Sequence, residues 1–505
     1  MKAIRTIFLL LWCAMLLGPV ALKVTNARWN VPAFLPFPKF ENRLPAERPS
    51  LLHTPPREFG PAFDAWYSDH FAHRTRIVNF YRRLLYERLK TPIGREVPGA
   101  GDWVFRRGAG WEELEDYLGV FELTDKELDD WRTFFEGRVE WARAHGILYL
   151  QFVSSVKAQV HAEKIPPVIR YHRGRNVSTQ VRDALKGSPA ERHVLFIGDE
   201  LRAAVQAGHE TYYHEDHHPA PYGAWMQFDA LNRRLREDFP DIGDMPFYEN
   251  GEVPADVLAG RIPGCYYGKN RRLAVSNPGT GQTYDGVRET SLRFPYTNVA
   301  TTNGMGHVSI LMGHDSFMRY SLESWKGRDG SVRFPFAPGI GRVDANLFVR
   351  FTTDSLLWWT SKRLPDVIIE QFPECRLNQN LMGYDDTMRR AAAFGRAVPL
   401  PEGEAPAPGT TVRALAVLEQ LRTSPDQPDE TLGEESTAPV RVLLRAGNAV
   451  CASVSVPTGI RRAVFFPEFS ADRIPAGAAL SVELEGGTCS SSRLELRMDE
   501  MPITN

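Results

Sequence analysis

The chain has 505 residues, of which about 43% are hydrophobic and 24% are charged, and its formal net charge is -2. One hydrophobic core rarely organises a chain of this length, so we expect at least two folded domains. The hydrophobic content excludes disorder over most of the chain. The near-zero charge also excludes a general affinity for nucleic acid, which depends on a clustered excess of Lys and Arg.

The N-terminus has the layout of a secretory signal or of a membrane anchor. Lys2 and Arg5 precede an apolar run at residues 7–22. As a helix this run would rise about 24 Å, somewhat less than the roughly 30 Å hydrocarbon core. We favour an uncleaved anchor within residues 1–29. Either alternative exports the rest of the chain, so the expected location is the periplasm, at the inner membrane.

The cysteines fit an exported protein. Cys13 lies in the apolar run, and the four others allow three disulfide pairings. We expect Cys451 to pair with Cys489 because both lie in the C-terminal segment, which leaves Cys265 with Cys375. The alternative is that some of them are buried free thiols.

Helical and strand patterns alternate along the first 400 residues or so. Aromatic and aliphatic residues at helical spacing predict one long helix or a helix pair over residues 61–90. The later alternation predicts an α/β domain at residues 30–397, with a largely parallel sheet covered by helices. The expected strands lie within 101–108, 147–155, 193–200, 307–317 and 364–372, and the clearest helices at 122–146 and 223–238.

The pattern changes near residue 398. Residues 398–410 form a Pro- and Gly-rich linker, and residues 424–437 form a polar acidic loop. Residues 411–505 predict a small β-sandwich, which is a candidate carbohydrate-binding domain. Its clearest expected strands are residues 441–447, 450–457, 463–469, 479–487 and 492–498.

The segment HEDHHPAPYGA, residues 214–224, contains three histidines and two carboxylates within five positions. His214 and His218 would share one face of a helix, but Pro219 and Pro221 disfavour a helix here. No second His or Cys cluster supplies further ligands in an obvious place, and a zinc site needs at least three protein ligands. We therefore expect no metal and no cofactor.

Asp216 and His218 favour acid–base chemistry instead. In an extended or turn segment, residues i and i+2 point to the same side, so the carboxylate can approach the imidazole. It would fix the tautomer and stabilise the imidazolium that forms when the other ring nitrogen takes a proton. The pair requires a nucleophile.

Ser316 is the candidate nucleophile. A mostly apolar strand runs into Gly313, and a helical pattern begins at Ser316. A serine at such a turn lies at the carboxyl edge of a parallel sheet, where ligands bind, and the first N–H groups of the helix can stabilise an oxyanion. The alternative is that Asp315 or Ser316 only caps the helix.

These motifs resemble those of the SGNH-like alginate O-acetyltransferase family, the alginate acetylation proteins and their DHHW-type relatives. Asp216-His217-His218, followed by Gly223-Ala224, is similar to their Asp-x-His-Trp...Gly-Ala signature, and residues 314–317 (HDSF) resemble their nucleophile segment. The resemblance spans roughly residues 40–385. Further matching stretches are 42–49, 63–74, 101–108, 153–166 and 364–377.

The resemblance implies an SGNH-hydrolase-like fold and a catalytic triad of Ser316, His218 and Asp216. Two residues depart from the pattern. Pro219 replaces the Trp that commonly follows the histidine, which removes a flat apolar surface near the base, and His314 stands where a Gly often precedes Asp-Ser.

The implied function is O-acetylation of an exported polysaccharide through an acyl-serine intermediate. The resemblance suggests a membrane-bound O-acyltransferase as the source of the acetyl group, since acetyl-CoA is not expected outside the cytoplasm. Two alternatives are a carbohydrate acetylesterase with the same triad and a non-catalytic polysaccharide-binding scaffold. Trp225, Trp358 and Trp359 could line a sugar groove or belong to the core, and Lys157 and His161 could contact an acidic polymer or lie on a solvated surface.

Overall fold

The structure is a computed structural model that describes residues 46–70, 91–244, 307–318, 339–421 and 440–499, with short gaps inside these ranges and isolated residues before them. It divides into two compact units. One comprises Met1–Phe105 with Arg272–Arg288, and the other Arg106–Arg271 with Glu289–Asn505.

The first unit contains α2 (Pro56–His70) and the strand β1 (Glu96–Pro98), which pairs with β2 (Val104–Arg106). α2 confirms the start of the helix expected over residues 61–90, and most of its remainder lies outside the described residues. Most of the expected anchor also lies outside them. Among the residues that are described, no helix is both long and apolar enough to cross a membrane.

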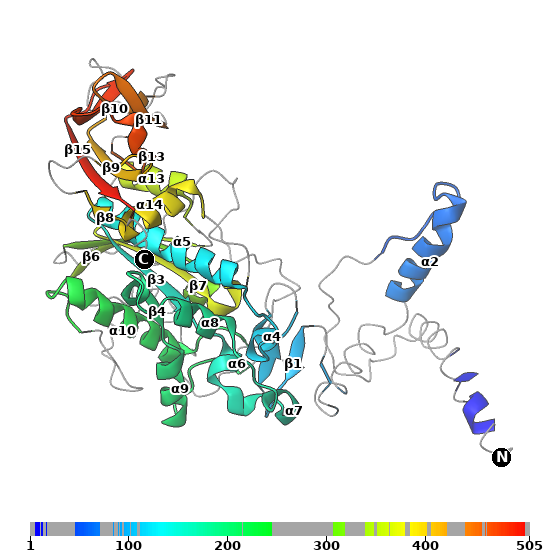
Figure 1. Ribbon diagram of the computed structural model, residues 1–505. Helices are drawn as coiled ribbons and strands as arrows, with labels where there is room; N and C mark the ends of the chain where they lie inside the picture. Colours follow the sequence, from blue (N-terminus) through cyan, green and yellow to red (C-terminus); the bar gives the residue numbers. More distant parts are fainter. Residues whose placement is uncertain are drawn as a thin grey trace. The chain divides into compact units, whose positions relative to one another are not determined.

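The second unit is built on a parallel sheet, which confirms the predicted fold class (Figure 1). Within the described residues this sheet has the strand order β4-β3-β7-β5-β6, and every neighbouring pair is parallel. The strands are β3 (Leu148–Ser154), β4 (Val194–Phe196), β5 (Val308–His314), β6 (Ile340–Leu347) and β7 (Val367–Pro373).

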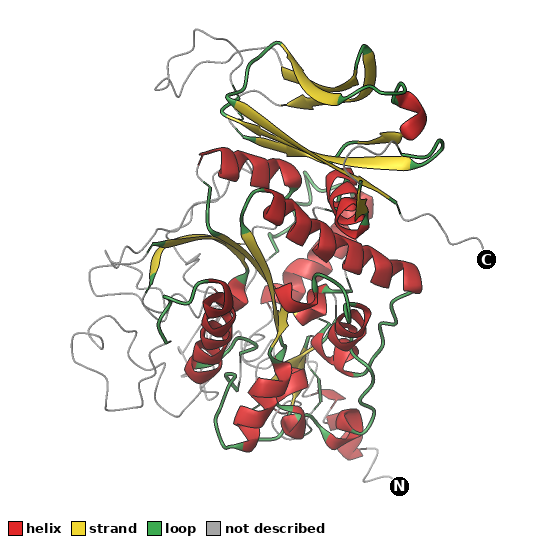
Figure 2. Cartoon of the chain, turned by 60° about the vertical axis from the view of Figure 1, so that its left-hand side comes forward, coloured by secondary structure: helices red, strands yellow, loops and turns green. Residues whose placement is uncertain are grey.

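Helices cover both faces of this sheet, as Figure 2 shows. Tyr149 on β3 belongs to a core cluster with Trp141 of α5, whereas Ser154 on the same strand hydrogen bonds to Gln227 of α10. Residues 149 and 154 point to opposite faces of a strand, so α5 and α10 lie on opposite sides. The helices of this unit include α4 (Glu113–Tyr117), α5 (Asp125–Ala144), α6 (Lys157–Val160), α8 (Val177–Ala184), α9 (Gly198–Gln206), α10 (Pro221–Asp238), α13 (Thr353–Lys362) and α14 (Asp386–Arg396).

The best-predicted helix is α5. The Thr124 side chain accepts the N–H of Glu127, and the Glu127 carboxylate accepts the N–H of Thr124, which is a complete capping box. Gly146 follows the helix with φ 73°, a conformation that glycine adopts without strain. Both the capping box and the terminal glycine can be recognised in the sequence, and α5 begins and ends next to them.

The strand order brings candidate functional residues together at the carboxyl ends of the strands. β3 connects to β4 on one side and β5 to β6 on the other, so the direction of winding reverses between β3 and β5, with β7 between them. In open α/β sheets ligands bind at the carboxyl ends of the strands where this reversal occurs. Lys157, Ser316 and Glu374 each follow one of these three carboxyl ends.

The C-terminal residues form two antiparallel sheets, which confirms the predicted sandwich. One sheet has the order β11-β10-β14, and the other has β12-β9-β15-β8 with β13 pairing to β9. The strand β9 was not among the clearest expected ones, although it is central in its sheet. The strands are β8 (Val398–Pro399), β9 (Thr411–Glu419), β10 (Val440–Ala446), β11 (Ala449–Val456), β12 (Ala463–Phe465), β13 (Glu468–Ser470), β14 (Leu480–Glu485) and β15 (Ser491–Met498).

The sandwich lies next to helices of the α/β domain (Figures 1 and 2). The two share a hydrophobic core cluster. Phe466 lies in one cluster with Trp141 of α5 and Phe394 of α14, and its ring is 5.7 Å from that of Phe394. Arg497 of β15 stacks over Phe394 at 4.4 Å. β8, at the start of the predicted linker, pairs with β15.

The expected disulfide between Cys451 and Cys489 is wrong. Both cysteines are free thiols, because Cys451 packs into one core cluster of the sandwich and Cys489 packs against another. Cys375 is a buried free thiol, and its expected partner Cys265 lies outside the described residues. The alternative of buried free thiols therefore holds for Cys375 and Cys451.

The shared core predicts that the sandwich stabilises the α/β domain. Phe466→Ala removes a ring from the cluster that includes Trp141, so it should lower the free energy of unfolding by about 3–5 kcal/mol. All eleven tryptophans precede residue 360, so urea unfolding followed by Trp fluorescence reports on the part of the chain before the sandwich. The control is Val450→Ala, at a side chain that is 43% exposed. An unchanged Trp-reported midpoint in Phe466→Ala would contradict the shared core.

Candidate active site

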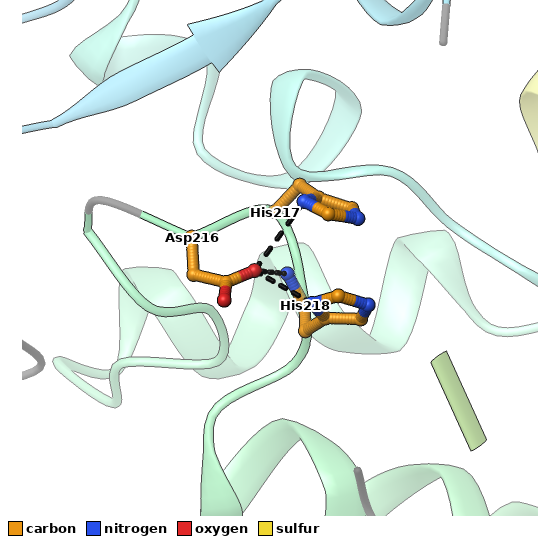
Figure 3. Close-up of side chains that lie close together, drawn as sticks. All are labelled: Asp216, His217 and His218. Carbon is orange, nitrogen blue, oxygen red and sulfur yellow. Dashed lines mark hydrogen bonds and ion pairs between the residues drawn. The ribbon is translucent and has the colours of Figure 1, made fainter. Parts of the chain in front are cut away.

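Asp216 and His218 meet as the i, i+2 spacing predicts (Figure 3). The Nδ1 atom of His218 is 2.6 Å from Oδ1 of Asp216, and the main-chain N–H of His218 donates to the same oxygen at 3.0 Å. The two bonds close a turn around the carboxylate, which fixes both the backbone and the ring of His218. With Nδ1 occupied, Nε2 is the ring nitrogen that can accept a proton.

His217 shares the same carboxylate. Its Nδ1 lies 3.3 Å from Oδ1 of Asp216, and the rings of His217 and His218 are 3.9 Å apart (Figure 3). Burial lowers the pKa of His217 well below its usual range, and the charges of His218 and Arg106 lower this pKa further. His217 is therefore neutral at neutral pH.

Asp216 is ionised, as the carboxylate partner of a catalytic histidine should be. Burial alone would raise the pKa of this carboxyl group, but the hydrogen bond and charge of His218, together with His217, outweigh burial and hold the pKa well below its usual range. Asp216 is ionised at any physiological pH. An ionised carboxylate at Nδ1 stabilises a protonated imidazole, as general base catalysis requires.

The loop that carries this pair closes on itself. Tyr212 and Pro219 form an isolated antiparallel bridge, and the N–H of Tyr213 donates to the carbonyl of His218 at 3.3 Å. The Tyr212 hydroxyl donates to the carbonyl of Ser155, beyond the end of β3. Pro219 thus helps to close the loop, at the position where the Asp-x-His-Trp signature has Trp.

Gly223 is required by close backbone packing. A Cβ at this position would lie 2.1 Å from the carbonyl oxygen of Thr211, a distance that no side chain tolerates. The same carbonyl accepts the N–H of Ala220 at 2.9 Å. The Gly of the Gly-Ala motif therefore lets the start of α10 contact the start of the loop.

Ser316 lies at the predicted turn after β5, and it is half-buried. Asp315 caps the helix that begins at Ser316, because its Oδ1 accepts the N–H of Phe317 at 2.9 Å. The ring of Phe317 is 5.5 Å from that of His218, so the serine segment packs against the base. Among the described residues, no hydrogen bond joins Ser316 to His218. Catalytic hydrogen bonds are often long in unliganded enzymes and tighten in the complex.

A chain of buried amides links the serine turn to α10. Gln371 of β7 accepts the N–H of Asp315 at 3.0 Å and donates to the Ser154 hydroxyl at 3.0 Å. Ser154 then donates to Gln227 of α10 at 3.3 Å. Because α10 begins directly after the Asp216 loop, this chain connects the two halves of the site. Nothing in the sequence singled out these residues.

The structure corrects the expectations for Lys157 and His161. Both are buried, so neither lies on a solvated surface or can contact a polymer. Nε2 of His161 is 2.9 Å from the Thr211 hydroxyl, and the Lys157 ammonium donates to carbonyls of the Asp216 loop. Their position shortly after the buried strand β3 was one signal of this in the sequence.

The three tryptophans considered as candidates for a sugar groove differ in their surroundings. Trp359 packs against the core cluster of α5 and α14, as the core alternative predicted. Trp225 is half-buried, with its ring 5.9 Å from that of Tyr222. The side chain of Trp358 lies outside the described part of the chain.

A buried pair of acids, Asp116 and Glu374, lies beside the site and was not predicted. Glu374 accepts the N–H of Val156 at 2.7 Å and the Ser178 hydroxyl at 2.5 Å. Burial raises the pKa of Glu374 to about 8, and the charge of Asp116 contributes to this increase. Burial likewise raises the pKa of Asp116 to about 6.

Asp216, His217 and His218 also have the residue types of a metal site, and their potential ligand atoms lie within 4.8 Å of one another. The short bond between His218 and Asp216 uses two of these atoms, so an ion held by them would compete with the acid–base pair. His214 is directed elsewhere, with Nε2 2.9 Å from Glu210.

The chain is similar to several solved structures. It matches AlgX of Pseudomonas aeruginosa at 15% identity and a TM-score of 0.33, over 80% of this chain and 94% of AlgX. It matches the O-acetyltransferase domain of AlgJ of Pseudomonas putida at 13% identity and a TM-score of 0.33, over 59% of this chain and 99% of that domain. A DHHW family protein of Eubacterium siraeum matches at 9% identity and a TM-score of 0.31, over 59% of this chain and 98% of that protein.

No protein-family model and no curated protein matches the sequence. The fold described above is established by the strand order and register of this chain.

The amide chain predicts that Gln371 holds the serine turn. Gln371→Leu leaves the N–H of Asp315 buried without its acceptor, which should cost about 1–3 kcal/mol of unfolding free energy. Amide hydrogen exchange at Asp315 should accelerate. Ser154→Ala, the matched control, breaks the next link but keeps the acceptor of Asp315, so exchange there should change little. Equal acceleration in both variants would contradict this role of Gln371.

The raised pKa of Glu374 predicts that stability decreases as pH rises from 4.5 to about 8. Because its folded pKa of about 8 lies above the ordinary 4.5, folding favours the protonated carboxyl group. The stabilisation is complete below pH 4.5 and is lost as pH rises through about 8. Urea unfolding across this range should show the decrease in the wild type, and Glu374→Gln should flatten it. A variant with an unaltered pH dependence would show that another group is responsible.

Proposed function

We propose that the chain is an O-acetyltransferase that moves an acetyl group through an acyl-serine intermediate onto hydroxyls of an exported polysaccharide. The observation that carries this proposal is the 2.6 Å contact between Asp216 and His218, with the segment of Ser316 packed against the His218 ring through Phe317. An oriented base beside a serine at the carboxyl edge of a parallel sheet is the arrangement that acyl transfer requires.

The first half-reaction forms the acyl-enzyme. Nε2 of His218 takes the proton of the Ser316 hydroxyl as Oγ attacks the acetyl carbonyl carbon. The carbonyl π electrons move to oxygen and then return, which breaks the bond to the leaving group. That group departs with the proton from His218, and the acetyl ester remains on Ser316.

The second half-reaction transfers the acetyl group. His218 takes the proton of a sugar hydroxyl, whose oxygen attacks the ester carbonyl. Oγ of Ser316 leaves and recovers the proton from His218. Asp216 stays ionised throughout, because its pKa is held far below neutral, and it stabilises the imidazolium in both halves.

The proposal extends to the cellular setting. The acceptor is an exported polysaccharide, the location is the periplasm, and the N-terminal segment serves as an inner-membrane anchor. A membrane-bound O-acyltransferase is the proposed partner that supplies acetyl groups. The apolar run at residues 7–22 with its flanking positive charges supports export.

Carbohydrate binding by the C-terminal sandwich stays a prediction. No Trp or Tyr follows residue 400, and Phe466 and Phe469 are buried. An aromatic stacking platform of the kind sugars favour would have to come from Phe465 or from the α/β domain.

Active-site trapping tests the nucleophile. A serine-directed fluorophosphonate should modify Ser316, and peptide mapping should find the label on that residue. Labelling should be lost in Ser316→Ala and should fall about 10³–10⁴-fold in rate in Asp216→Asn, because the tautomer of His218 is no longer fixed. Ser355→Ala, at a helical serine near the start of α13, is the matched control and should label normally. An unlabelled wild type would rule out the triad.

An assay with an added sugar acceptor distinguishes an acetyltransferase from an esterase. The purified protein, incubated with an acetyl-nitrophenol and an oligosaccharide, should yield acetylated sugar. Release of free acetate at the same rate with and without sugar would identify an esterase. Unchanged polymer acetylation in cells that carry Ser316→Ala at normal protein level would identify a non-catalytic scaffold.

A further inference from the structure

The Lys157 ammonium lies beneath the loop that carries the acid–base pair. Its side chain is 1% exposed. Nζ donates to the carbonyls of Asp216 at 3.0 Å, His214 at 3.0 Å and Tyr213 at 3.3 Å. An ammonium has three N–H donors, so these three carbonyls match its hydrogen-bonding capacity.

The buried carboxyl group of Glu113 interacts electrostatically with Lys157. This carboxylate is 2% exposed and accepts the N–H of Ala158 at 2.7 Å and that of Arg106 at 3.1 Å. Burial raises the pKa of Glu113, and the charge of Lys157 opposes this increase. Burial of an ammonium group costs free energy, so packing alone does not explain why a lysine is present at this position.

The contacts of Asp216 suggest a role for Lys157. The carbonyl of this residue is held by Lys157, while its carboxylate holds both the N–H and Nδ1 of His218. The position of the His218 ring therefore depends on the position of the Asp216 backbone. The described residues of this loop form bends, and among them no regular hydrogen-bond ladder extends beyond the bridge of Tyr212 and Pro219.

We propose that Lys157 is a positioning residue, which fixes the backbone at Asp216 so that the carboxylate holds the His218 ring in its reactive orientation. Its effect on turnover rests on the proposed function, whereas its effect on the bond between Asp216 and His218 does not. The role is performed by hydrogen bonds to main-chain carbonyls, so the requirement is for N–H donors at this place. A neutral side chain of equal volume fills the space without holding the loop.

Lys157→Met is the first test, because methionine keeps most of the volume and removes the donors. Turnover of an acetyl-nitrophenol should fall about 10²-fold, the effect of a displacement of about 1 Å in a catalytic group. The KM for the donor should change little. Lys186→Met, at a side chain 68% exposed on the surface, is the control and should retain wild-type turnover.

Chemical rescue separates positioning from general stability. In Lys157→Ala, propylammonium should restore part of the lost turnover, because it supplies N–H donors within the cavity. Tetramethylammonium carries the same charge without N–H donors and should not restore it. Lys157→Arg, which keeps donors and charge, should retain more turnover than Lys157→Met, and it provides a folded variant if the neutral ones do not fold.

An NMR measurement that does not depend on turnover distinguishes a failure of the Lys157 positioning role from a failure of the proposed acyl transfer. The low-field proton signal of His218 Nδ1–H, recorded by NMR, should be present in the wild type and lost or broadened in Lys157→Met. If the wild type shows no acyl transfer or hydrolysis, the proposed function fails while this signal still tests Lys157. An unchanged signal in Lys157→Met, or rescue by tetramethylammonium as effective as by propylammonium, would overturn the positioning role.

Discussion

The hydrogen bond between Asp216 and His218 is the interaction on which the proposed chemistry depends. It joins residues two positions apart, so its geometry is set by a single turn of the chain. A turn alone constrains the position of the His218 ring only weakly. Contacts from the surrounding structure fix it further. The Lys157 ammonium holds three carbonyls of the Asp216 loop, and Gly223, which has no side chain, lets the start of α10 pack closely against Thr211.

The parallel sheet explains why these parts meet. β3, β7 and β5 are neighbours, and their carboxyl ends carry Lys157, Glu374 and Ser316 in turn. Gln371 ties the serine turn to Ser154 and through it to α10. The site is thus assembled from residues far apart in sequence by polar groups that are buried and hydrogen bonded. Low-dielectric surroundings strengthen these bonds, and they make the loss of any one partner costly.

Local signals made much of this predictable. The capping box at Thr124 and the terminal Gly146 define α5, and period-based patterns found β3, β5 and β7. The i, i+2 spacing predicted the contact between Asp216 and His218. The roles of Lys157, Gln371 and Glu374 were not predictable, because each depends on which strands become neighbours. The same limit applies to Cys451 and Cys489, whose shared segment did not imply a shared core cluster.

The proposed acyl transfer requires Ser316 to reach the imidazole that Asp216 orients. The most direct measurement is a crystal structure of the protein after reaction with a fluorophosphonate. We predict an adduct on Oγ of Ser316, with Nε2 of His218 about 2.6–3.2 Å from an adduct oxygen or from Oγ itself. An adduct on another residue, or a modified Ser316 that lies out of reach of the His218 ring, would contradict the central claim.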